Sequence, residues 1–89
     1  MLDLNDEINT KLAITAKGID LAVRLVDFIM LDTMEKRLNM IITKYANELI
    51  EYPQLRDSAL ALYRKLDNAK RQVVKLRKQQ KRSELEKGL

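Results

Sequence analysis

Apolar residues recur at alternating spacings of three and four positions in the C-terminal part of the chain. This spacing places them on one stripe of a helix, and it is typical of a helix that lies along another helix. The stripe turns polar at Gln80 and Ser83. Its apolar members, called the seam below, are Ala59, Leu62, Leu66, Ala69, Val73 and Leu76.

Pro53 separates this helix from the sequence before it. The residue before a proline avoids the helical conformation, whereas proline itself suits the first turn of a helix. We therefore expect a helix over residues 53–87 that follows a tight turn at Tyr52. The alternative is a continuous helix that is kinked at Pro53.

The pattern before Pro53 predicts two more helices. A helix over residues 20–51 has one apolar side, and its first half is apolar almost all round. A shorter helix over residues 5–17 precedes it, because Gly18 suits the left-handed position that ends many helices. The alternative is one long helix that contains Gly18 at a cost of about 1 kcal/mol. The apolar side of the second helix consists of Met34, Leu38, Ile41, Tyr45 and Leu49.

These elements predict an all-α fold in a single domain, residues 1–89. The chain has only two glycines and one proline, so its helix-forming stretches are long and uninterrupted. The expected architecture is a helical hairpin of two long antiparallel helices preceded by a short helix.

The two arms of the expected hairpin do not match along their whole length. With a turn at Pro53, Leu38 lies opposite Leu66 or Ala69, but Phe28 lies opposite polar residues near Arg77. The uncovered apolar surface favours a homo-oligomer, a dimeric or higher helical bundle, over a monomeric three-helix bundle. The predicted interface residues are Ile19, Ala22, Val23, Val26, Phe28, Ile29 and Met30.

Charge is distributed unevenly along the chain. Residues 1–53 carry 6 Lys/Arg and 9 Asp/Glu, whereas residues 54–89 carry 11 and 4. In the first part, Asp20, Arg24 and Asp27 have the spacing of ion pairs within one helix. In the second part, the cations lie outside the seam and form a basic face. Its predicted binding residues are Arg64, Lys70, Arg71, Lys75, Arg77, Lys78 and Arg82.

A helix face with charges of one sign favours a polyanionic partner. Our first hypothesis is a non-enzymatic accessory protein that binds the phosphate backbone of nucleic acid, DNA or RNA, without reading its sequence. The second is a protein–protein interaction module, an inhibitor, immunity or scaffold protein that docks its basic helix on an acidic partner. A structural coiled coil with a solvated basic face is the third. An anionic membrane surface is less favoured, because the helix lacks a wide apolar face.

Several kinds of chemistry lack their usual residues. The chain has no histidine, cysteine or tryptophan, which excludes the common zinc sites and histidine-assisted nucleophiles. We therefore expect no enzyme, no cofactor and no metal. The acidic start is unlike a signal peptide, and the apolar region between Ile19 and Met34 has no uncharged run longer than four residues. A cytoplasmic protein without a transmembrane segment is expected.

Overall fold

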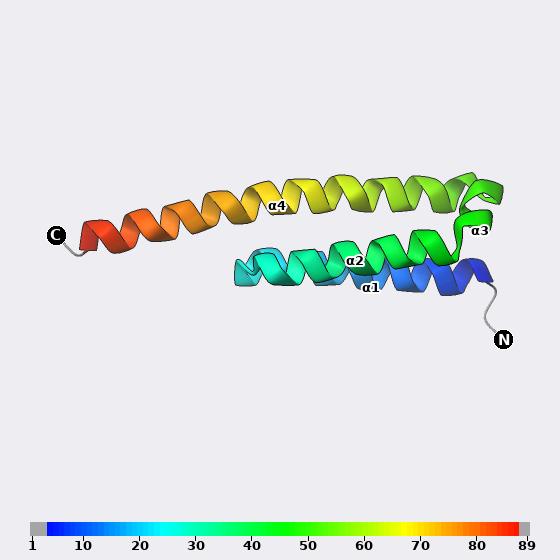
Figure 1. Ribbon diagram of the computed structural model, residues 1–89, viewed down its shortest axis with the longest axis horizontal. Coiled ribbons are helices and arrows are strands. Elements are labelled where there is room, and N and C mark those ends of the chain that lie inside the picture. Colours follow the sequence, from blue (N-terminus) through cyan, green and yellow to red (C-terminus); the bar gives the residue numbers. More distant parts are fainter. Residues whose placement is uncertain (1–3, 88–89) are drawn as a thin grey trace.

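The computed structural model describes the backbone of residues 4–87 and the side chains of residues 4–79. Over this range the chain is all-helical and forms a bundle of helices α1 (Leu4–Leu25), α2 (Phe28–Lys44), α3 (Ala46–Glu51) and α4 (Pro53–Lys87). α1 and α2 pack together as an antiparallel pair, and α3 leads into α4, which returns along both (Figure 1). α4 then continues beyond the turn that joins α1 to α2.

The core lies where α4 packs against the α1–α2 pair. The seam is buried from Ala59 through Val73, and α2 contributes the apolar side that its spacing predicts. α1 adds Thr15, whose hydroxyl donates to the Lys11 carbonyl oxygen at 2.9 Å and is thereby satisfied inside the core. The other buried residues of α1 are Ile8, Leu12, Ile19 and Ala22.

Gly18 lies inside α1, so the helix end predicted at this position is wrong. A Cβ atom at Gly18 would overlap the sulfur of Met34, which is a buried residue of α2. The missing side chain therefore leaves room for the Met34 side chain against α1, and Gly18 serves helix packing instead of helix termination. The predicted short helix over residues 5–17 is replaced by a helix that extends to Leu25.

The turn between α1 and α2 has the geometry that the sequence suggested for Gly18. Val26 has a φ of 51°, in the left-handed region, although it is a β-branched residue. The Val26 N–H donates to the Val23 carbonyl at 3.1 Å, and the Asp27 N–H donates to the Ala22 carbonyl at 2.9 Å. These two bonds define a Schellman ending. Asp27 then caps α2, because its side chain accepts a hydrogen bond of 3.0 Å from the Met30 N–H.

The predicted helix over residues 20–51 is therefore interrupted twice, at Val26–Asp27 and again at Tyr45. Tyr45 leaves the helical region with φ −111° and ψ 29°, while its N–H still donates to Ile41 and its carbonyl still accepts from Leu49. The backbone bends here, and these two hydrogen bonds join Tyr45 to the helices on both sides. The bend places the short helix α3 between α2 and the extended residue Tyr52, after which α4 begins at Pro53.

Candidate nucleic-acid interface

α4 consists of two parts with different surroundings. We call residues 53–73 the covered segment, because its seam residues are buried against α1 and α2. We call residues 74–87 the projecting segment, because α4 extends past the α1–α2 turn there (Figure 1). Among the side chains described, which end at residue 79, Val73 is the last buried one, and Leu76 is only half-buried. The projecting segment therefore leaves the core within the basic part of α4, which already begins at Arg64.

Most cations of the covered segment are already paired within the chain. Lys65 contacts Asp20 of α1 at 2.9 Å, and Lys70 forms an ion pair with Glu35 of α2. Arg71 contacts Asp67, one turn earlier on α4, at 3.2 Å. Of the three predicted binding residues in this segment, Lys70 and Arg71 are thus partly neutralised. Arg64 is exposed and contacts no carboxylate of the described residues at ion-pair distance.

Tyr63 adds a neutral contact on the α2 side of the covered segment. Its hydroxyl donates to the Asn39 side-chain oxygen. Burial raises the pKa of Tyr63 above 10.0, and the nearby Glu35 carboxylate raises it further. The phenol therefore remains protonated at neutral pH. Together with Lys65 and Lys70, it fixes α4 between its two neighbours.

The projecting segment presents cations without such partners. Lys75, Arg77 and Lys78 are exposed, and no described carboxylate lies within ion-pair distance of them. The sequence itself has no Asp or Glu between Asp67 and Glu84. The three cations occupy different sides of the helix, so the positive charge surrounds it. The seventh predicted residue, Arg82, belongs to α4, but its side chain lies outside the described residues.

Arg24 is a candidate binding residue that the sequence reasoning missed. Asp20, Arg24 and Asp27 were expected to form ion pairs within one helix. Instead, Asp20 pairs with Lys65 and Asp27 caps α2, and no ion pair of Arg24 occurs among the described residues. Arg24 lines a groove of about 710 Å³ between α1 and α4, where Arg64 lies on the other side. Only the packing of α1 beside α4 brings these two arginines to one groove.

The fold buries part of the predicted oligomer interface within the single chain and leaves the rest accessible. Ile19 and Ala22 are buried within the single chain, so we remove them from the proposed interface. Val23, Val26, Phe28 and Met30 are half-buried, and Ile29 is 77% exposed. Val26, Phe28, Ile29 and Met30 lie at or next to the α1–α2 turn. α1 shields part of the surface that the sequence left uncovered, because it continues to Leu25.

Neither metal-ligand clusters, nor membrane spans, nor similarity to known proteins assigns a function to the chain. Among the described residues, no cluster of three or more side chains suited to hold a metal ion is present. None of the helices in that part of the chain combines the length and the hydropathy needed to cross a bilayer. Neither a protein-family model, nor a curated protein, nor a solved structure matches the chain. Its function has to be inferred from its own residues.

Proposed function

We propose that the chain is a non-enzymatic protein that binds the phosphate backbone of nucleic acid through the projecting segment of α4. The observation that supports this proposal most directly is the contrast within α4. Lys65, Lys70 and Arg71 have carboxylate partners. Lys75, Arg77 and Lys78 belong to the projecting segment, are exposed and contact no described carboxylate. Unpaired cations on an exposed helix attract phosphates and displace the counterions that surround them.

The shape of the projecting segment suits a duplex. A helix with its side chains is about 10–12 Å wide, and the major groove of B-DNA is about 12 Å wide. A helix without neighbours is able to lie along such a groove with cations directed toward both strands. Arg64 and Arg24 extend the positive surface toward the bundle. Arginine adds bidentate phosphate contacts that lysine does not make.

The proposal is tested by binding to generic duplex DNA and duplex RNA over a salt series. The variant K75Q/R77Q/K78Q removes three charges from the projecting segment. If each cation contacts a phosphate, the slope of log K against log salt should become shallower by about 3. The matched control is K17Q/K36Q/K44Q, which removes three exposed charges from α1 and α2. The control should bind nearly as well as the unmodified chain.

Two results would contradict this proposal. One is an absence of binding to either duplex at about 50 mM salt, where electrostatic binding is strong. The other is an equal loss of affinity in the two triple variants, which would show that only net charge matters. The second candidate, docking of the same segment on an acidic protein surface, predicts a saturable protein complex that survives nuclease treatment.

Self-association through the α1–α2 turn is a further part of the proposal. Leu25 and Ile29 are 61% and 77% exposed there, next to half-buried Val26 and Phe28. Two copies that meet at this turn would cover these side chains and bring two projecting segments close together. Sedimentation equilibrium at micromolar concentration should show a species heavier than 10.4 kDa. I29K should reduce it to the monomer; a monomer in the unmodified chain would rule out this interface.

A further inference from the structure

A second open groove lies along the α1–α2 pair, and none of the residues that line it belongs to α4. α4 packs on one face of the α1–α2 pair and buries its seam there. The other groove has a volume of about 920 Å³ and runs between α1 and the second half of α2. Ile41 lies in its floor and is buried, whereas Ile14 and Met40 on its sides are 50% and 71% exposed.

The charged residues that line this groove are all cationic. They are Lys11 of α1 and Lys36, Arg37 and Lys44 of α2. No carboxylate lines the groove, and the one described ion pair that involves these four residues is that of Lys11 with Glu7, at 3.7 Å. An apolar floor with a positive rim is complementary to an apolar ridge flanked by carboxylates.

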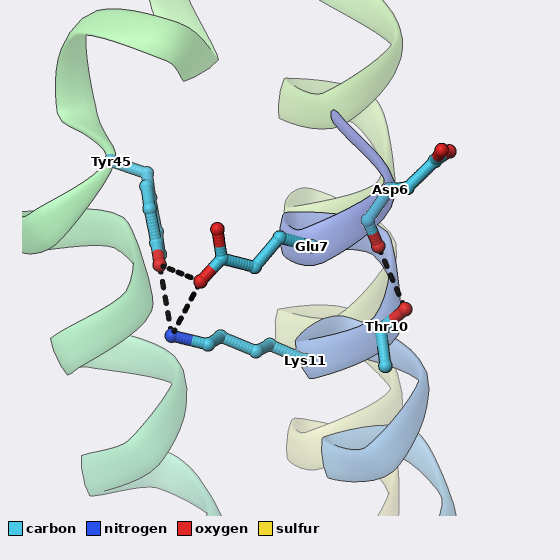
Figure 2. A network of polar contacts seen from close by, with 5 residues as sticks. All are labelled: Asp6, Glu7, Thr10, Lys11 and Tyr45. Carbon is cyan, nitrogen blue, oxygen red and sulfur yellow. Dashed lines mark hydrogen bonds and ion pairs between the residues drawn. The ribbon is translucent and has the colours of Figure 1, made fainter. Parts of the chain in front are cut away.

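Lys11 is fixed at one end of the groove by Tyr45. The Lys11 ammonium group donates to the Tyr45 hydroxyl at 2.8 Å, and Glu7 lies beside both (Figure 2). The hydrogen bond with Tyr45 raises the pKa of Lys11 above 10.5, although desolvation opposes this effect. Lys11 therefore carries its charge at any neutral pH.

The dimensions of the groove suit a helix. Its α2 wall runs from Thr33 to Lys44, which corresponds to about 18 Å or three turns of helix. A helix placed there would become the fourth member of a bundle around α1 and α2. A second copy is a poor occupant, because a two-fold axis would place the cationic rims of both copies against each other.

We infer that this groove docks an acidic amphipathic helix of a partner protein. Its apolar residues pack on Ile14, Met40 and Ile41, and its carboxylates pair with Lys36, Arg37 and Lys44. This is the helix-in-groove mode of recognition, with anchors at successive turns of the docked helix. No residue of α4 lines the groove, so the surface does not include the cations of the proposed nucleic-acid interface.

The test uses two synthetic stapled helical peptides of equal length. Both carry leucines at i, i+3, i+4 and i+7, and the flanking positions are glutamate in one peptide and lysine in the other. Fluorescence anisotropy should show saturable binding of the acidic peptide only. The charge reversal K36E/R37E/K44E should lower the affinity for the acidic peptide by about tenfold or more. The matched reversal K75E/R77E/K78E on α4 should change this affinity by less than about twofold.

A second variant tests the apolar floor. M40E should lower the affinity for the acidic peptide by about tenfold. Circular dichroism should show unchanged helicity, because Met40 is largely exposed. The inference is overturned if the acidic peptide does not bind, or if reversal on α4 weakens it as much as reversal on α2. It is also overturned if M40E instead abolishes binding to vesicles of phosphatidylserine, or converts a dimer to a monomer in sedimentation.

Discussion

The covered and projecting segments of α4 belong to one helix but have different surroundings. In the covered segment, the seam is buried and the flanking cations Lys65 and Lys70 meet carboxylates of α1 and α2. In the projecting segment, the same register leads to polar residues, and the cations have no described partner. Within the described residues, Lys65, Lys70 and Arg71 of the covered segment are paired, whereas Lys75, Arg77 and Lys78 of the projecting segment contact no carboxylate.

Proline substitutions at Gln72 and Gln79 should give the largest difference in folding stability between the two segments. Both residues are exposed and lie two turns apart on the same side of α4. Proline inside a helix costs about 3 kcal/mol or more. Q72P should unfold the bundle, because it interrupts α4 next to buried Val73. Q79P should leave the thermal midpoint in circular dichroism nearly unchanged while it weakens nucleic-acid binding. Equal destabilisation by both variants would show that the projecting segment is needed for folding.

Truncation of one seam leucine in each segment should give the next largest difference, in the free energy of unfolding. Leu66 is 2% exposed, whereas Leu76 is half-buried. L66A should lower the free energy of unfolding by about 3 kcal/mol through lost burial and a residual cavity. L76A should cost about 1 kcal/mol or less. Urea denaturation measures both values. A cost for L76A as large as that for L66A would indicate that another copy or a partner covers the projecting segment.

Single lysine substitutions compare the binding roles of the two segments. Lys70 pairs with Glu35, whereas Lys75 contacts no described carboxylate. K75Q should reduce the salt slope of nucleic-acid binding by about 1, as expected for the loss of one phosphate contact. K70Q should change the slope by less, because the lysine must leave its ion pair to reach a phosphate. A larger effect of K70Q would place the interface on the covered segment.

The smallest effect concerns the titration of Tyr63. Burial and Glu35 raise its pKa above 10.0, so the folded state holds the phenolic proton more tightly than the unfolded state. The corresponding stability is present below pH 10.0 and is lost as the pH rises through the raised pKa. Ultraviolet titration of the unmodified chain and of Y63F identifies the Tyr63 component. A midpoint at or below 10.0 would contradict the packing of Tyr63 against α2.

Periodicity predicted the parts of the fold that depend on packing along helices. The seam from Ala59 to Val73 is buried, and so are the predicted apolar residues of α2 and α3. The break before Pro53 also occurs where the backbone chemistry of proline requires it. These features follow from local spacing and from one residue with a fixed φ angle.

The turn between α1 and α2 was missed because two residues have unusual roles. Glycine is the common left-handed residue at a helix end, but Gly18 is used for close packing against Met34. Val26 takes the left-handed position instead, at a steric cost of about 1–2 kcal/mol that tertiary packing must offset. The one local signal was Asp27, which is a strong N-cap residue. The position of Arg24 in the groove between α1 and α4 was equally hidden, because it depends on how far α1 extends.

The length of α4 also determines how the chain moves through solvent. The molecule extends 60 × 22 × 16 Å, and its radius of gyration is 16.4 Å. A compact domain of this chain length would have a radius of gyration of about 12 Å. A monomer should therefore elute early in gel filtration and tumble anisotropically, as a rod does. Its association state should accordingly be judged from its mass, since its hydrodynamic size alone would suggest a larger particle.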